Sequence, residues 1–147
     1  MTTTQRSGSM LEEWPYAYVV NSDKAANYCA FCLKKSEASL QRCSRCRLTH
    51  FCNEACQRAA WTEHRDECTS LANVRPRIPT ALARLMARII FKRRDHPSTD
   101  PPPTTFNNRR FEDLMNHRKE ITEDPERSEH FVALCHVLRE YVGIDQL

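Results

Sequence analysis

The chain has 147 residues, enough for about one ordinary domain, with 22 Lys and Arg, 19 Asp and Glu and a formal net charge of +3. No stretch approaches the ~20 consecutive apolar residues of a membrane-spanning helix, which excludes a membrane segment. The start, MTTTQRSGSM, lacks the basic and apolar regions of a secretory signal. We therefore expect an intracellular protein whose eight cysteines are reduced, and not a disulfide framework.

Two segments precede the first cysteine. Residues 1–13 are polar and rich in Thr and Ser, a composition that predicts a disordered start. Residues 14–28 form a lead-in to the cysteine-rich segment. Its first seven residues, WPYAYVV, combine aromatic and β-branched side chains, which predicts a short strand.

The next segment, residues 29–68, holds eight metal-ligand residues and seven of the eight cysteines. They are Cys29, Cys32, Cys43, Cys46, Cys52, Cys56, His64 and Cys68. A structural zinc ion takes four tetrahedral Cys or His ligands, so this set predicts two zinc ions as cofactors. Zinc ligation requires thiolates, and the two filled sites together carry about −3, so the zinc-loaded chain is about neutral.

The same segment carries local signals for its backbone. Asn53 is a capping residue for a helix from Ala55 to Trp61. His64 and Cys68 are spaced by four residues on a second helical turn, so their ligand atoms converge on one metal ion. Both Cys-x2-Cys pairs are expected in knuckle-like turns. His50 is not needed as a ligand and is expected to face solvent.

The spacing leaves two ways to divide the ligands between the metals. In a sequential scheme, the first four cysteines hold one zinc ion and the last four ligands hold the other. In an interleaved scheme, one ion is held by Cys29, Cys32, Cys52 and Cys56, and the other by Cys43, Cys46, His64 and Cys68. Both schemes satisfy the coordination chemistry of zinc, and spacing alone does not choose between them.

Residues 75–147 are predicted to form an all-α segment with a proline-rich linker at 95–105. A weaker helical pattern covers Asn107 to Thr122. A third helix is expected to start at Asp124-Pro125, to run to about Val142 and to end at Gly143.

The first helix of this segment is predicted from Thr80 to Arg94, with one apolar face. Arg84, Arg88 and Lys92 recur every four residues on another face, which we expect to be solvated. Residues 75–119 contain eleven basic and four acidic side chains, so contact with nucleic acid phosphates is an alternative function.

The complete order C-x2-C-x10-C-x2-C-x5-C-x3-C-x7-H-x3-C closely resembles the MYND-type zinc finger, as do Phe51, Gln57 and Trp61 between the ligands. The resemblance implies a small zinc-stabilised α+β module with two interleaved zinc sites, followed here by the all-α segment. It also implies binding of proline-rich partner peptides of the Pro-x-Leu-x-Pro type, with Ser44, Gln57 and Trp61 at the peptide. A role of Trp61 in the small core between the zinc sites is the structural alternative.

The flanking residues resemble the SET-MYND lysine methyltransferases, the SMYD family. The resemblance rests on PYAYVV before the finger, CAFC at its start and TALARLMARII after it. It implies an intracellular location in the nucleus, the cytoplasm or both. Part of a SET-MYND methyltransferase acting in chromatin regulation is therefore a further alternative.

The chain departs from that family in its catalytic parts. Enzymes of this kind bind S-adenosylmethionine through Gly-x-Gly and Asn-His elements, but this chain has only Gly8 and Gly143. Its Asn116-His117 pair lies in a predicted helix, and Cys135, expected as a buried small hydrophobe, is its only cysteine after the finger. We therefore expect no catalytic or cofactor-binding residues, and a truncated or non-catalytic relative that is not itself an enzyme.

Overall fold

The computed structural model describes residues 15–95 and 114–143. The predicted disordered start at 1–13 lies outside these ranges, as does the predicted linker at 95–105 except for its first residue. The described elements are η1 (Ser22–Lys24), β1 (Gln41–Arg42), β2 (His50–Phe51), α1 (Glu54–Ala59), α2 (Trp61–Asn73), α3 (Ala81–Asp95), α4 (Arg118–Glu123) and α5 (Pro125–Val142). None of these helices combines the length and the apolar character needed to cross a bilayer.

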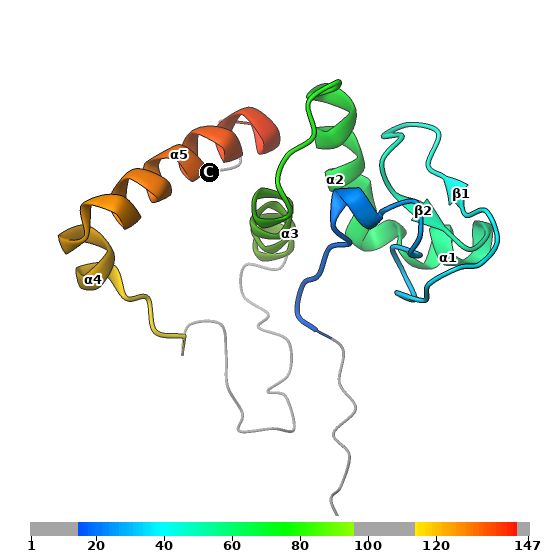
Figure 1. Cartoon of the computed structure of the whole chain (residues 1–147), viewed down its shortest axis with the longest axis horizontal. Coiled ribbons are helices and arrows are strands. Elements are labelled where there is room, and N and C mark those ends of the chain that lie inside the picture. Colours follow the sequence, from blue (N-terminus) through cyan, green and yellow to red (C-terminus); the bar gives the residue numbers. More distant parts are fainter. Residues whose placement is uncertain (1–14, 96–113, 144–147) are drawn as a thin grey trace, which may run out of the picture.

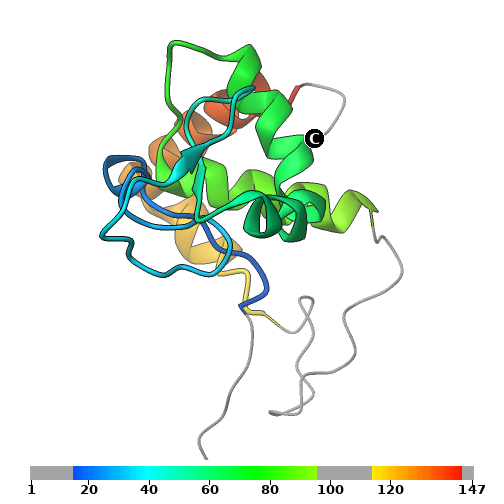
Figure 2. The same cartoon turned by 90° about the vertical axis from the view of Figure 1, so that its right-hand side faces the viewer.

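The elements are arranged along the longest axis of the molecule (Figure 1). Strands β1 and β2 and helix α1 occupy one end, α4 and α5 occupy the other, and α2 and α3 lie between them. The turned view shows α2 and α3 running in different directions (Figure 2). Helix α2 contacts α1, α3 and α5, so it connects the cysteine-rich end to the helical end.

The cysteine-rich end is built from two tight turns and a small sheet. In each turn the residue after the second cysteine adopts a left-handed backbone, with φ of 59° at Leu33 and 55° at Arg47. Their N–H groups donate to the carbonyls of Cys29 (3.0 Å) and Cys43 (2.9 Å), which closes the turns. The predicted knuckle-like turns are confirmed. Strands β1 and β2 pair antiparallel around the second turn.

The first helix after the sheet, α1, begins within one residue of the prediction but ends at Ala59, before the predicted end at Trp61. The Asn53 side chain accepts a hydrogen bond from the Cys56 N–H and caps α1. Helix α2 starts at Trp61 and is longer than the single turn expected, because no Gly or Pro interrupts the chain before Pro76. Its extra turns carry Leu71 into the core.

The strand predicted at residues 14–20, at the start of the lead-in, is wrong for the described residues 15–20, which are in no strand. Their carbonyl oxygens accept hydrogen bonds from side chains of α3 instead of from a neighbouring strand. Arg84 donates to Val20 O, Arg88 donates to Tyr18 O and Lys92 donates to Tyr16 O, each at 2.8 Å. The lead-in is therefore held by side chains of α3, and not by strand pairing.

The predicted solvated face of α3 is also wrong. Helix α3 covers Ala81–Asp95, close to the predicted range, but Arg84 and Arg88 are buried and Lys92 is half-buried. Leu82, on the apolar pattern, is 44% exposed. The reason is that the basic face meets acidic side chains of α2 and the carbonyls of the lead-in. Charge pairing, rather than apolar periodicity, decides which side of α3 faces inward.

The last two helices differ in how closely they follow the prediction. The helix expected from Asn107 to Thr122 starts only at Arg118, with residues 107–113 outside the described part. The Asn116 side chain accepts the Arg118 N–H (2.9 Å), and His117 takes a left-handed conformation (φ 47°), so Asn116-His117 precedes the helix. Helix α5 has the predicted limits, and Gly143 ends it at φ 99°.

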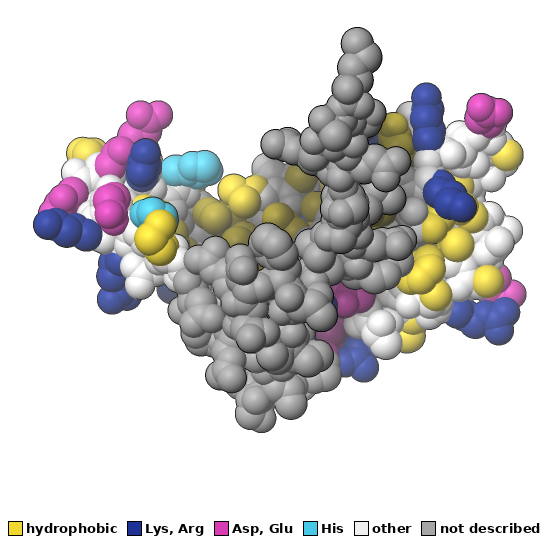
Figure 3. Space-filling view, turned by 90° about the horizontal axis from the view of Figure 1, so that it is seen from below, with side chains coloured by type: hydrophobic (Ala, Val, Ile, Leu, Met, Phe, Trp, Pro, Cys, Tyr) yellow, Lys and Arg dark blue, Asp and Glu magenta, His cyan; other side chains and the backbone are white. Residues whose placement is uncertain are grey.

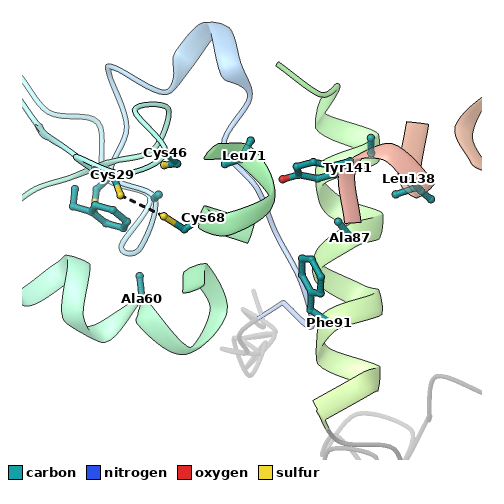
Figure 4. Packing of buried hydrophobic residues seen from close by; sticks show 13 residues of the cluster. Cys29, Cys46, Ala60, Cys68, Leu71, Ala87, Phe91, Leu138 and Tyr141 are labelled. Carbon is teal, nitrogen blue, oxygen red and sulfur yellow. Dashed lines mark hydrogen bonds between the residues drawn. The ribbon is translucent and has the colours of Figure 1, made fainter. Parts of the chain in front are cut away.

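Buried hydrophobic residues form one cluster from the cysteines to α5. Leu71 on α2 lies between the cysteine-rich end and the packing of α3 with α5 (Figure 4). The helical part of the cluster consists of Leu71, Ala83, Ala87, Phe91, Leu138 and Tyr141. The small residues of α3 allow the close approach of α5.

Ala87→Leu is expected to lower the free energy of unfolding by about 1–3 kcal/mol, because Ala87 is fully buried and extra methyl groups have no room. Urea unfolding followed by circular dichroism measures this change. The matched control is Ala133→Leu on the exposed side of α5, which should change stability by less than about 0.5 kcal/mol. Equal unfolding midpoints for the two variants would contradict the packing described.

Candidate metal centre

The first ligand cluster joins the first knuckle to the start of α1. Cys29 and Cys32 come from the knuckle, Cys52 follows β2, and Cys56 lies in the first turn of α1. The four sulfur atoms all lie within 4.8 Å of one another. Sγ of Cys32 and Sγ of Cys52 are 3.7 Å apart. Cys29 is buried, whereas Cys52 is exposed.

The second cluster joins the second knuckle to α2. Cys43 and Cys46 come from the knuckle, and His64 and Cys68 lie one turn apart on α2. Their ligand atoms are again within 4.8 Å of one another, and all four residues are buried. Sγ of Cys43 and Cys68 are 3.7 Å apart, and Nε2 of His64 is 3.8 Å from Sγ of Cys46.

Both clusters have the geometry that a tetrahedral zinc ion requires. Zinc–sulfur bonds of about 2.3 Å place neighbouring sulfur atoms about 3.8 Å apart at tetrahedral angles, close to the observed 3.7 Å. The structure brings the ligands together as the interleaved scheme describes. Each cluster therefore suits one zinc ion, which would hold two segments of chain together.

Other polar groups surround the second cluster. The buried Thr49 hydroxyl is 3.2 Å from both Cys46 Sγ and His64 Nε2. The Cys68 thiol lowers the pKa of the Cys46 thiol, with His64 and Thr49 adding to the effect against the influence of burial. This lowering of the pKa favours the thiolate form of Cys46, which metal ligation requires.

His64 is oriented by its own helix. Its Nε2 faces the ligand cluster, and its buried Nδ1 lies 4.0 Å from Oε2 of Glu67, three residues further along α2. Burial tends to raise the pKa of Glu67, but His64 and the charges of Arg88 and Arg84 lower it to about 2. Glu67 is therefore an ionised carboxylate beside the metal centre.

Glu67, Arg84 and Arg88 are the residues of this site that the sequence analysis missed. Glu67 directly precedes Cys68 and follows His64 at helical spacing, so its position on α2 predicts that it faces inward. Arg84 and Arg88 lie four residues apart on α3, so the sequence shows that they share one face of that helix. It does not show that this face meets Glu67, which is 17 and 21 positions away in the chain.

The three predicted peptide-binding residues all lie on the finger. Ser44 is exposed in the second knuckle, and Gln57 is half-buried on α1. Trp61, the first residue of α2, is 44% exposed, and its ring lies edge-on to that of His64 at 6.2 Å. Trp61 is thus a surface residue that also contacts a metal ligand.

The remaining residues considered in the sequence lie outside both clusters. His50 is half-buried on β2, not solvent-facing as expected, because its Nδ1 is 2.9 Å from the Leu48 carbonyl oxygen. Cys135 is half-buried on α5. His117 lines an open cavity of about 470 Å³ between α3, α4 and α5.

Cys43→Ser is expected to remove the buried zinc ion and to unfold much of the finger, because ligation energy is folding energy in small metal domains. Cys52→Ser, at the less buried first cluster, is the matched comparison and should lose the other ion with a smaller loss of helix. Metal analysis should give about one zinc ion per chain for each variant. Circular dichroism reports the helix content, and two retained zinc ions in Cys43→Ser would contradict this ligand set.

Comparison with known proteins agrees with this geometry. The MYND finger family matches residues 29–68. The chain is 34% identical over 130 residues to mouse "Histone-lysine N-methyltransferase SMYD3". The matched region covers 87% of this chain and 29% of the relative. It is 30% identical over 142 residues to human "N-lysine methyltransferase SMYD2", covering 92% of this chain and 31% of the relative.

A plant protein shows the same partial coverage. Arabidopsis thaliana "Histone-lysine N-methyltransferase ASHR1" is 33% identical over 118 residues, covering 78% of this chain and 24% of the relative. The chain thus spans less than a third of the length of these relatives. Residues 29–68 are a MYND-type zinc finger, and most of the chain is similar to the SMYD lysine methyltransferases, consistent with their N-terminal portion.

Proposed function

We propose that this chain is a non-catalytic protein-interaction module whose finger binds proline-rich partner peptides of the Pro-x-Leu-x-Pro type. The observation that carries the proposal is Trp61, a large aromatic residue that is 44% exposed at the start of α2, beside a metal ligand. Exposed aromatic rings give prolines an apolar platform. Contact with His64 limits the motion of the ring, so little side-chain entropy is lost on binding.

The small sheet supports the same mode of binding. Within the described ranges, β1 pairs only with β2, and both of its residues, Gln41 and Arg42, are exposed. An extended peptide adds to such an edge through main-chain hydrogen bonds, which set its register. A proline-rich peptide is already partly ordered, which lowers the entropy cost of this step.

The surface of the finger fits a partly apolar ligand. Hydrophobic side chains gather on the finger at the right-hand end of Figure 3, with Lys and Arg side chains beside them. In the proposed complex Trp61 contacts a proline ring, while the Gln57 amide and the Ser44 hydroxyl bond to the peptide backbone. The metal centres hold these elements in place and take no part in chemistry.

Part of a protein-lysine methyltransferase is the second candidate, and the similarity to the SMYD proteins over most of the chain favours it. In this case the finger and the helices would support a catalytic part and bind its partners. Two of the relatives are named for histone lysine, a nuclear substrate. A nuclear or cytoplasmic location is therefore part of the proposal.

Nucleic acid binding through residues 75–119 has less support. Arg84 and Arg88 are buried against Glu67, so neither is available to phosphates. Residues 96–113 of this segment lie outside the described part of the chain. A salt titration of duplex binding tests the idea, because phosphate contacts weaken steeply with salt.

Trp61→Ala is expected to weaken binding of a Pro-x-Leu-x-Pro peptide by about tenfold or more, because the variant loses an aromatic anchor. Zinc content should stay at about two ions per chain. Isothermal titration calorimetry and metal analysis measure the two quantities. Phe131→Ala, an exposed aromatic on α5, is the matched control and should bind as the parent does. Unchanged peptide affinity in Trp61→Ala would contradict the proposed peptide-binding site.

The chain alone is expected to transfer no methyl group from S-adenosylmethionine. Radiolabelled methyl incorporation into histones is the measurement, with the zinc-stripped chain as the control. Incorporation above that control would overturn the non-catalytic proposal and favour the methyltransferase alternative.

A further inference from the structure

A buried charged cluster links the second zinc centre to the lead-in at residues 15–20. Glu67 is completely buried, and its two oxygens are held by different arginines of α3. Nε of Arg84 donates to Oε1 at 2.8 Å, and Nε and Nη2 of Arg88 donate to Oε2 at 2.8 and 2.6 Å. The carboxylate therefore has a fixed orientation.

That orientation places Glu67 behind the histidine ligand. Oε2 is 4.0 Å from Nδ1 of His64, a buried atom with no hydrogen-bond partner in the described structure. When Nε2 binds a metal, Nδ1 carries a proton and needs an acceptor, which in zinc proteins is commonly a carboxylate. A shift of about 1 Å would close this gap to hydrogen-bond length. Glu67 is a carboxylate placed to be that acceptor.

The arginines extend the same cluster to the lead-in. Nη1 of Arg84 donates to Val20 O and Nη1 of Arg88 to Tyr18 O, each at 2.8 Å. The Arg88 guanidinium also lies over the Tyr18 ring, 5.5 Å from its centre. The Tyr18 hydroxyl donates to Phe31 O at 3.2 Å, in the first knuckle. The lead-in is thus bound to α3 and to the first knuckle of the finger.

The charges of this cluster balance when zinc is bound. A zinc ion with three thiolates and a neutral histidine carries about −1, and Glu67 adds another negative charge. Arg84 and Arg88 supply two positive charges. Buried charges are tolerated when they are paired and hydrogen-bonded, so each member depends on the others.

We propose that Glu67 is a positioning residue for the second zinc centre, and that through Arg84 and Arg88 it makes the docking of residues 15–20 depend on zinc at that centre. Glu67 orients His64 without touching the metal. Zinc binding at the second centre and docking of the lead-in therefore stabilise each other. This inference does not rest on the peptide-binding proposal.

Cobalt(II) substitution of the full chain tests the first half, because a site with four thiolate ligands and a site with three thiolates and one imidazole have different absorption bands. Glu67→Gln should release the metal of the second centre to a chelator about 10-fold faster or more and leave the metal of the all-cysteine first centre unchanged. Unchanged release in Glu67→Gln, or equal acceleration at both centres, would overturn the positioning role.

Glu63→Gln is the matched control for this measurement. Glu63 lies one turn earlier on α2 and contacts Lys92 (3.1 Å), which also bonds to the lead-in. The variant therefore removes a carboxylate charge from the same helix without touching the cluster around Glu67. Its release rates at both centres should match those of the parent.

Limited chymotrypsin digestion tests the second half, because Tyr16 and Tyr18 are half-buried cleavage positions in the lead-in. In the zinc-loaded chain, cleavage there should be at least several-fold faster in Glu67→Gln than in the parent. Removal of the metal of the second centre from the parent should speed cleavage similarly. Unchanged cleavage in either case would overturn the coupling. If Glu67→Gln does not fold, Arg88→Lys, which keeps the charge but not the paired hydrogen bonds, is measured by the same criteria.

Discussion

The burial of Glu67 on α2 is the constraint on which the rest of the structure depends. A carboxylate without water needs opposite charges and donors, and two arginines of α3 provide both. Their remaining N–H groups need acceptors in turn, and the carbonyls of the lead-in supply them. Charge pairing therefore positions α2, α3 and residues 15–20 relative to one another, and apolar packing fills the space around them.

Metal ligation acts on the same helix. Helix α2 presents His64 and Cys68 to the second metal centre and Leu71 to the packing with α3 and α5. Zinc bound at that centre would hold the first turns of α2 against the knuckle. The buried cluster then continues from the cysteines to α5 without a break (Figure 4). The finger and the helices are thus joined by shared side chains.

The elements that the sequence predicted well are those with strong local chemistry. Asn53 caps α1, and Asp124, Pro125 and Gly143 limit α5, because capping groups act within one turn of the chain. The face of α3 was predicted incorrectly. Periodicity shows which residues share a face of a helix, but it does not show what covers that face. Peptide binding at Trp61 stays a prediction, since its partner is another molecule.

The sequence by itself determined the eight ligand residues, the knuckles, the start of α1 and both ends of α5, because each depends on residues a few positions apart. Only the tertiary structure decided what covers the basic face of α3 and what pairs with the lead-in. These contacts join residues as far apart as Lys92 and Tyr16, separated by 76 positions. Burial makes such contacts obligatory, since a charge removed from water must find its partner wherever the fold brings one close.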